Sequence, residues 1–318
     1  MNQIQKGLPD QLLNKAFNKA WFKLFVRKEF NGLQLSLPDG LEELQNACQI
    51  NGSLGWCVNL GAGANYFSGF FSGKGAKKIF TNAECVLAGS GGLAEIVEEV
   101  ENGFLISGKW GKATGAIHAT YFTCNGILPS GETVSFAISK DQVRLIDDWQ
   151  LFGMKQSSSL GFATEKAFVP SEFVFRINEP EIESSYEIHH LPFNCFAQFS
   201  MTAAIIGLAE GIIQNITPSE LKEVAQKSLA ELKNYCDNTA KTLKRTAEKV
   251  WGQLPKKATD IDTLEIENLV KQTGIEIFQK VNQLYFDAGL IMADEKHLAH
   301  ESYKDFMLAI QHSIFKKN

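Results

Sequence analysis

The chain has 318 residues, of which 44% are hydrophobic and 21% are charged, and its formal net charge is -5. These values are typical of a globular protein with two or three structural units of about 100–200 residues each. The negative charge, together with the absence of any Lys/Arg cluster that could follow a phosphate backbone, argues against a nucleic-acid partner.

Six cysteines are spread along the chain without a CxxC pair: Cys48, Cys57, Cys85, Cys124, Cys195 and Cys236. A zinc site would need two close pairs, or one pair with spaced histidines, so we expect no metal. Reduced, mostly buried thiols are typical of a cytosolic protein. The first residues lack the apolar core of a signal peptide. The longest apolar stretch, residues 54–71, is interrupted by asparagines and glycines, so we expect a cytoplasmic protein without a membrane span.

Up to about residue 80 the apolar residues recur at helical spacing. Those between residues 12 and 20 would form the apolar face of one helix, and those between 41 and 50 the face of another. Pro38, Asp39 and Gly40 are expected to form the turn between them. Residues 54–71 are expected to be a buried helix. We therefore predict an N-terminal helical domain over residues 1–82.

From about residue 85 to residue 175 the apolar period changes to two. Asn102 and Gly103 separate two extended runs, and this pair predicts a hairpin because both residues tolerate positive φ. Further strands are expected at 119–124, 134–139, 143–146 and 161–169, with turns at 125–126 and 129–131. Short strands at this spacing indicate a compact barrel or sandwich, which we assign to a middle β-barrel domain over residues 83–180.

After Pro192 the strand patterns nearly vanish. Helices are expected over residues 193–216, 221–251, 262–288 and 301–315. Pro218 suits the start of the second helix, and Pro255 would end it. Four helices joined by short turns indicate an antiparallel bundle, assigned to residues 187–318. The first helix has an apolar stripe that is wider than one helix of a monomeric bundle needs to bury. This predicts a homo-oligomer that forms through the bundle. The stripe consists of Phe196, Met201, Ile205, Ile206 and Leu208.

Three segments resemble the acyl-CoA dehydrogenase superfamily. Residues 102–119 resemble a hairpin that in this superfamily is followed by a small hydroxyl residue and a glycine beside a flavin ring. Residues 148–159 resemble its W-x-x-x-G-M-R-G-T-G-S element, and residues 167–170 resemble its closing V-F-V-P strand. The resemblance covers nearly the whole chain. It implies an α+β fold with N-terminal helices, a central antiparallel β-barrel and a C-terminal four-helix bundle.

Further matches favour one branch, the flavin-dependent two-component monooxygenases (hydroxylases). Residues 51–56 resemble its D-G-S-x-G-W helix start, and residues 114–119 resemble its S-G-x-x-H-A sequence. Asp305 and His312 resemble its R-D…Q-H pair, and their spacing would put both on one helical face about two turns apart. The terminal segment lacks a match to the Glu-Gly base of many acyl-CoA dehydrogenases.

The resemblance implies an oxygenase that borrows reduced FMN or FAD from a separate flavin reductase and hydroxylates a small aromatic or related substrate. Oxygen chemistry of reduced flavin needs a dry site and an acceptor for the flavin N5–H group, a role that fits Thr114. Imidazole titrates near neutral pH, so His312 and His118 are the catalytic candidates. The residues that would bind the flavin are Trp110, Thr114, Gly115, Ser157, Ser158 and Ser159. Relatives bury flavin between subunits, which implies a homodimer or homotetramer.

Two other functions stay open. One is an acyl-CoA dehydrogenase that acts on a thioester. The other is a non-catalytic or ligand-binding relative that has lost the flavin. The second alternative is supported by three departures from the family pattern, because Gln156 and Ser158 replace glycines of the flavin loop and Glu301 replaces an arginine.

Each candidate residue also has a purely structural interpretation. Thr114 could be a strand residue bonded to backbone, and the serines at 157–159 could cap their own turn. Trp110 and Trp149 fit the core of the β domain better than a flavin contact. The adjacent His189 and His190 are expected to lie in a solvated loop, since neighbouring residues rarely share a metal.

Overall fold

The computed structural model describes residues 7–254 and 263–316. The N-terminal part contains the expected helices, which are α1 (Asp10–Asn18), α2 (Leu37–Ile50), α3 (Gly52–Asn65) and α4 (Gly73–Phe80). The predicted turn at residues 38–40 is wrong, because these residues open α2. The Ser36 hydroxyl accepts a hydrogen bond from the Asp39 amide at 3.3 Å, and Pro38 lies in the first turn, where its missing N–H costs nothing.

Helix α3 is almost entirely buried, as expected for an apolar segment. Its first turn is capped by Asn51, whose Oδ1 atom accepts from the Leu54 amide at 2.9 Å. A 3₁₀ turn, Tyr66–Phe70, extends the buried segment. Helix α3 packs against β1 as well as against α2 and α5, so it lies between the strands and other helices.

The β region comprises two four-stranded sheets rather than a closed barrel. The strands are β1 (Leu87–Leu93), β2 (Ile96–Val100), β3 (Gly103–Ala113), β4 (Tyr121–Ile127), β5 (Thr133–Ser139), β6 (Arg144–Ile146), β7 (Leu160–Pro170) and β8 (Val174–Phe175). One sheet has the order β1-β4-β5-β8 and the other β2-β3-β7-β6. The two share a core that includes Phe122, Phe136 and Phe162. The predicted antiparallel barrel is therefore wrong in two respects. The strands form two sheets that do not close into a barrel, and β1 pairs with β4 in parallel.

The predicted β2–β3 hairpin is confirmed, with Asn102 at a φ of 62°. The predicted turn at 125–126 is wrong, because both residues lie inside β4. Asn125 accepts from the Ser135 hydroxyl at 2.7 Å and donates to the Gly91 carbonyl at 2.9 Å, so its side chain links strands. A Cβ atom on Gly126 would lie 2.7 Å from Val97. The glycine is therefore needed for close packing and not for a turn.

The C-terminal part contains α5 (Phe193–Gln214), α6 (Glu223–Trp251), α7 (Leu264–Ala288), α8 (Leu290–Ala293) and α9 (Leu298–Ala309). The predicted break at Pro255 and helix start at residue 262 lie outside the described residues. A separate four-helix bundle is not confirmed. Helix α5 contacts α6 and α7 but also α2, and α9 contacts both α5 and α3. Helices from both ends of the chain share one core, and the domain boundaries at residues 82 and 187 stay predictions.

Helix α5 is long and apolar enough to cross a membrane, but 83% of its most apolar window is buried inside the molecule. A helix that is apolar all round is typical of a protein core. The apolar stripe from Phe196 to Leu208 is covered within the monomer, with every member at most 6% exposed. This stripe therefore gives no reason to expect an oligomer, and the oligomeric state stays a prediction.

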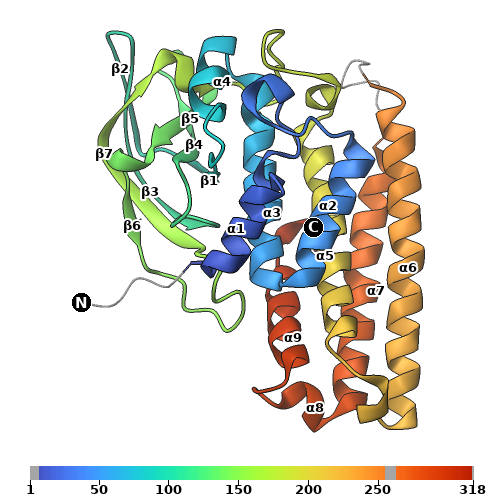
Figure 1. Ribbon diagram of the computed structural model, residues 1–318. Helices are drawn as coiled ribbons and strands as arrows, with labels where there is room; N and C mark the ends of the chain where they lie inside the picture. The colour runs from blue at the N-terminus through green and yellow to red at the C-terminus, as the bar shows by residue number, and fades with distance from the viewer. Residues whose placement is uncertain (1–6, 255–262, 317–318) are drawn as a thin grey trace.

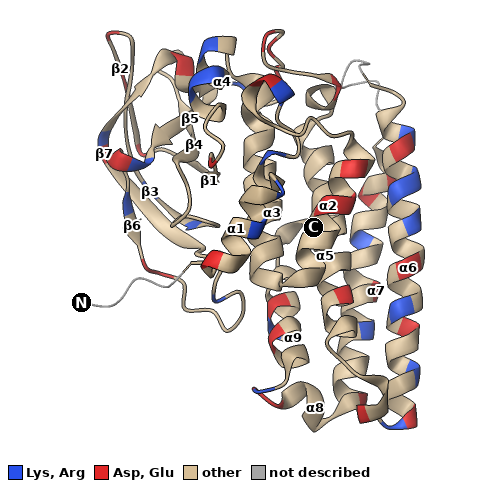
Figure 2. Ribbon diagram, in the orientation of Figure 1, with Lys and Arg blue, Asp and Glu red and all other residues tan. Residues whose placement is uncertain are grey.

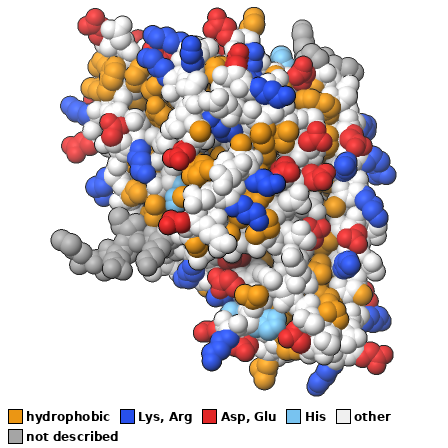
Figure 3. Space-filling model, viewed as in Figure 1, with side chains coloured by type: hydrophobic (Ala, Val, Ile, Leu, Met, Phe, Trp, Pro, Cys, Tyr) orange, Lys and Arg blue, Asp and Glu red, His pale blue; other side chains and the backbone are white. Residues whose placement is uncertain are grey.

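The strands gather on one side of the molecule and the long helices α6 and α7 stand on the other (Figure 1). Charged residues line the outer helix α6 (Figure 2). Over the face shown in Figure 3, acidic and basic side chains are interspersed. All six cysteines are buried and free, as predicted.

Candidate active site

A cavity of about 390 Å³ lies between α3, α5 and the sheet that contains β1, β4 and β5. This volume is in the usual range of small-molecule sites. Thr114 and His312 are the predicted site residues that line it. Much of the wall is apolar, including the aromatic residues Phe67, Phe175, Phe193 and Phe196. The cavity therefore combines an apolar wall with a few polar groups.

Thr114 is positioned by the turn that follows β3. Gly115 has a φ of 77°, which favours glycine. Its amide donates to the Ser157 carbonyl at 2.9 Å, and the Ala116 amide donates to the Ser158 carbonyl at 3.1 Å. These two bonds fix the turn to the loop that precedes β7.

A chain of hydroxyl groups runs behind Thr114. Its Oγ1 atom lies 2.9 Å from Ser159 Oγ, which lies 2.8 Å from Ser157 Oγ. Ser157 Oγ donates to the Met154 carbonyl at 2.8 Å. Since a carbonyl only accepts and a hydroxyl has one proton, Ser157 must accept from Ser159, and Ser159 must accept from Thr114. Thr114 therefore presents only lone pairs to the cavity.

Ser157, Ser158 and Ser159 are fully buried behind Thr114 and do not line the cavity. Ser158 has a φ of 49°, a conformation that suits the glycine it replaces in the family pattern. Its hydroxyl has no hydrogen-bond partner among the described residues. Ser157 and Ser159 can thus act on a ligand through Thr114 rather than by direct contact.

His118 lies outside the cavity lining and contacts the N-terminal segment. Its Nε2 atom accepts from the Leu8 amide at 3.0 Å. Burial, followed by the charge of Lys140, lowers the pKa of His118 and favours its neutral form. A Cβ atom on Gly7 would lie 2.4 Å from the same nitrogen. The structure therefore gives His118 a structural contact to residues 7–8.

His312 lies beyond the end of α9, in the turn before the 3₁₀ segment Ser313–Phe315. The prediction that it shares a helical face with Asp305 is therefore wrong. Its Nδ1 atom accepts from the Ile314 amide at 3.3 Å, and its ring meets Trp56 edge-on at 6.3 Å. Burial lowers the pKa of His312. A neutral imidazole with Nδ1 as acceptor carries its proton on Nε2.

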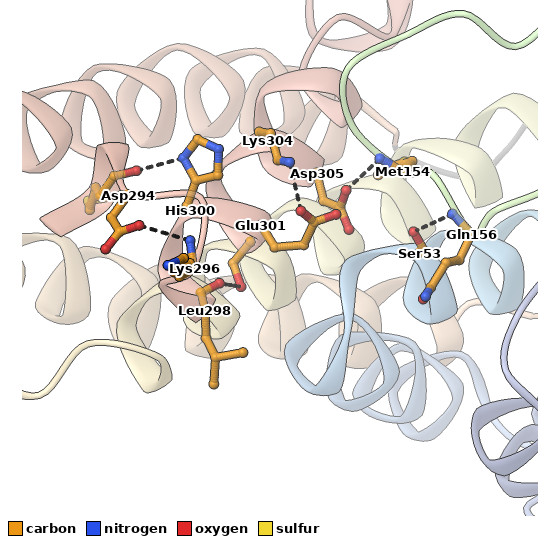
Figure 4. Close-up of polar contacts among 12 residues, drawn as sticks. Ser53, Met154, Gln156, Asp294, Lys296, Leu298, His300, Glu301, Lys304 and Asp305 are labelled. Atoms are coloured by element: carbon orange, nitrogen blue, oxygen red, sulfur yellow. Dashed lines mark hydrogen bonds and ion pairs between the residues drawn. The ribbon is translucent and has the colours of Figure 1, made fainter. Parts of the chain in front are cut away.

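Asp305 connects α9 to the loop that carries the serines. It is 2% exposed, and its carboxylate accepts from the Met154 amide (Figure 4). In the same view, the Gln156 amide donates to the Ser53 hydroxyl at 3.4 Å. Burial raises the pKa of Asp305 to about 6. The α9 carboxylate thus anchors the residue whose carbonyl ends the hydroxyl chain.

Glu301 and Lys304, which both replace arginines of the family pattern, form an ion pair with each other at 2.7 Å (Figure 4). Glu301 is exposed. This departure therefore changes the surface of α9 and not the wall of the cavity.

Trp110 lies in the interior of the β region rather than at the cavity. Its ring stacks on Phe162 at 4.8 Å, and its Nε1 atom donates to the Gly92 carbonyl at 3.2 Å. The structural interpretation of Trp110 thus fits its position better than a flavin contact does.

His189 is buried, so the expected solvated loop is wrong for this residue. Its Nδ1 atom accepts from the Tyr186 amide at 3.0 Å, and Tyr66 packs against its ring at 5.1 Å. Burial lowers the pKa of His189 to about 3. The described residues contain no group of three His, Cys, Asp or Glu side chains able to hold a metal ion.

No protein-family model matches the chain. A pigment production hydroxylase from a Rhodococcus species is 23% identical over 214 residues, which are 64% of this chain and 55% of the relative. The oxygenase component of p-hydroxyphenylacetate 3-hydroxylase from Acinetobacter baumannii is 23% identical over 226 residues, 66% of this chain and 53% of the relative. The chain thus spans about half the length of these curated relatives.

Among solved structures, 3-HSA hydroxylase from Rhodococcus sp. RHA1 superposes with a TM-score of 0.85 at 17% identity, covering 97% of this chain and 87% of the other. XiaF from a Streptomyces species, in complex with FADH2 and glycerol, gives 0.82 at 16% identity and covers 97% and 85%. The predicted resemblance to the flavin-dependent monooxygenases is confirmed. The fold is that of acyl-CoA dehydrogenase-like hydroxylases.

Sequence reasoning missed two contributors to the candidate site. Asn59 lines the cavity from α3, and nothing marks it among the apolar residues around it. Met154 contributes only backbone atoms, so its side chain gives no signal. Asp305 was found through the family pattern, but its contact with Met154 joins segments far apart in the sequence.

Proposed function

We propose that this chain is the oxygenase component of a two-component flavin-dependent monooxygenase. It would use reduced FMN or FAD from a separate reductase to hydroxylate a small aromatic or related substrate. The observation that carries this proposal is the Thr114 hydroxyl, which can only accept hydrogen bonds from the cavity because it donates its own proton to a hydrogen bond with Ser159.

An acceptor at this position fits the reduced form of a flavin. Reduced flavin carries a proton on N5, whereas oxidised flavin has a lone pair there. Thr114 and the Gly115 turn would contact the ring, and Ser157 and Ser159 would fix the direction of the Thr114 hydroxyl. When bound, reduced flavin supplies the electrons that activate oxygen. The apolar wall of the cavity excludes water, which strengthens such polar contacts.

His312 is the residue we assign to proton transfer. It lines the cavity together with Thr114, and its lowered pKa keeps the imidazole neutral near pH 7. A neutral ring can donate from one nitrogen and accept at the other in successive steps. His118 is a weaker candidate, because the Leu8 amide occupies its Nε2 atom.

The relatives support a flavin and an aromatic substrate. One is named a resorcinol hydroxylase that depends on FADH2, and it is 27% identical over 164 residues. Another solved neighbour, TdsC from a Paenibacillus species, is in complex with FMN and indole and has a TM-score of 0.78. The reductase partner, the cytoplasmic location and a homodimer or homotetramer are parts of this proposal that follow from the same relationship.

The acyl-CoA dehydrogenase alternative lacks a carboxylate base at the cavity. Among the described residues that line it, none is Asp or Glu, whereas many acyl-CoA dehydrogenases use a glutamate to abstract the proton next to the thioester carbonyl, and the base must lie within hydrogen-bond reach of that proton. We therefore favour the oxygenase over the dehydrogenase.

The test is an anaerobic titration of the purified protein with reduced FMN and reduced FAD, followed by addition of oxygen and p-hydroxyphenylacetate or resorcinol. We expect binding of one reduced flavin at micromolar concentration and formation of a hydroxylated product. Absence of binding to either reduced flavin would overturn the proposal and favour the non-catalytic relative, in which Ser158 and Gln156 replace the flavin-contacting glycines.

A further inference from the structure

Asn59 of α3 has an unmet hydrogen-bonding group at the wall of the cavity. Its side chain is 2% exposed and lines the cavity. The Nδ2 atom donates to the Met201 sulfur at 3.4 Å. The Oδ1 atom has no hydrogen-bond partner among the described residues. A buried amide oxygen without a donor costs free energy, so such groups in proteins usually meet a ligand or a water molecule.

Three other polar side chains at the cavity, Ser135, Asn125 and Ser200, are already paired. Ser135 donates to Asn125 at 2.7 Å, and Asn125 donates to the Gly91 carbonyl at 2.9 Å. The Ser200 hydroxyl donates to the Ala197 carbonyl at 3.2 Å. Asn59 therefore differs from these neighbours in having an acceptor that no described residue satisfies.

Asn59 lines the cavity from α3. It follows Trp56, the contact of His312, by one helical turn on α3. Phe67 lies eight residues further along the chain, in the 3₁₀ turn that follows α3, and packs against Phe175 at 5.3 Å and Phe193 at 4.8 Å. The wall of the cavity thus offers a free acceptor and a histidine together with several aromatic rings.

We propose that Asn59 is a specificity-determining residue whose Oδ1 atom accepts a hydrogen bond from an O–H or N–H group of an aromatic substrate. The unsubstituted part of the ligand would then extend toward Phe67. A site built to bond a hydroxyl rejects an analogue without one, because its own polar group is left unpaired. The inference rests on the proposed function only in calling the bound molecule a substrate. Binding of an aromatic ligand at Asn59 requires neither flavin nor turnover.

The test compares p-cresol with toluene, which differ only in the hydroxyl group. Dissociation constants are measured on the full-length protein without flavin, by calorimetry or by quenching of tryptophan fluorescence. We expect the wild type to bind p-cresol about tenfold more tightly than toluene. Asn59→Leu has a similar volume and no acceptor, and it should abolish this preference. Asn59→Asp keeps an acceptor and should retain it.

Ser200→Ala is the matched control, because Ser200 also lines the cavity but its hydroxyl is already paired. It should leave the preference for p-cresol unchanged. Circular dichroism and Tm check that each variant folds, and Asn59→Asp gives an independent result should Asn59→Leu not fold.

Equal affinity of the wild type for the two ligands, or binding of neither, would overturn the inference, as would a preference that survives in Asn59→Leu. A preference that depends on Asn59 in a protein that binds no reduced flavin would refute the proposed function and leave this inference standing. If the protein hydroxylates a substrate but Asn59→Leu keeps the preference for p-cresol over toluene, the proposed function stands and this inference is refuted.

Discussion

The direction of the Thr114 hydroxyl is decided at a backbone carbonyl that Thr114 does not touch. Met154 accepts from Ser157, which leaves Ser157 to accept from Ser159 and Ser159 to accept from Thr114. Each hydroxyl has one proton, so the chain has a single consistent direction. From its residue type alone, the Thr114 hydroxyl could donate or accept a hydrogen bond. The hydrogen bonds of the neighbouring serines allow it only to accept one from a ligand.

Ser159→Ala should therefore weaken the preference of the site for reduced over oxidised flavin. Without Ser159, the Thr114 hydroxyl can rotate and donate to N5 of oxidised flavin. We expect the ratio of affinities for reduced over oxidised flavin to fall by about tenfold, which is about 1.4 kcal/mol. Titration of the same protein with flavin in both redox states measures this ratio. Ser228→Ala is the control. Ser228 lies on α6, its hydroxyl donates to Asp287, and it does not line the cavity.

His189 should make the fold sensitive to acid. Its folded-state pKa is about 3, below the value of about 6.5 in an unfolded chain. Between these values the unfolded chain binds a proton that the folded chain does not, so stability is lost as the pH falls. We expect the Tm of the wild type to decrease below pH 6.5 more steeply than that of His189→Asn. Parallel Tm curves for the two proteins would contradict this, and His190→Asn serves as control.

At the level of elements, the loop before β7 is held by two helices that come from opposite ends of the chain. Asp305 of α9 accepts from the Met154 amide, and Ser53 of α3 accepts from the Gln156 amide. A Cβ atom on Gly52 would lie 2.5 Å from the Asp305 carboxylate, so this approach requires a glycine. The hydroxyl chain behind Thr114 thus depends on how these helices pack.

Asp305→Asn should stabilise the protein at high pH and lose this advantage in acid. The folded-state pKa of Asp305 is about 6, above the unfolded value of about 3.9. The folded protein therefore takes up a proton between pH 6 and 4, and the wild type gains stability over that window. Asparagine is neutral throughout and its oxygen can still accept from Met154. Thermal unfolding at pH 8 and pH 4.5 measures the difference, and an equal difference in Tm at both would contradict the prediction.

At the scale of the whole molecule, helices from the two ends of the chain share one core. Phe25 is fully buried and its ring meets Phe196 of α5 edge-on at 5.0 Å. We expect Phe25→Ala to lower the free energy of unfolding by about 3–5 kcal/mol. Hydrogen exchange should accelerate in α5 as well as in α2, because one core supports both.

Phe286→Ala is the matched control for Phe25→Ala. Phe286 is 80% exposed, and its truncation should change the free energy of unfolding by at most about 0.5 kcal/mol. Faster exchange confined to the N-terminal helices in Phe25→Ala would instead support the separate domains that the sequence suggests.

Local signals predicted the parts of the fold that depend on neighbouring residues. The hairpin at Asn102 and the helix over residues 193–216 are of this kind, since their patterns lie within the element itself. Strand β1 was missed because its glycine-rich sequence has no alternation. A barrel and a pair of sheets give the same alternation, so their difference could not be predicted.

The candidate site was predictable only where the family pattern marks it. Thr114 and His312 were found this way, and both line the cavity. The turn that carries His312, the pairing of Asp305 with Met154 and the unpaired oxygen of Asn59 depend on contacts between distant segments. No pattern within one segment contains that information.

The parallel pairing of β1 with β4 has a consequence for the order of folding. The β2–β3 hairpin lies between these strands in the sequence and forms from local contacts. Strand β1 must wait for β4, since Leu87 pairs with Tyr121 across that hairpin, and pairings over long sequence separations form slowly. Gly89 and Gly91 of β1 line the cavity. A nascent chain would therefore complete its hairpin well before β1 and β4 form their wall of the binding pocket.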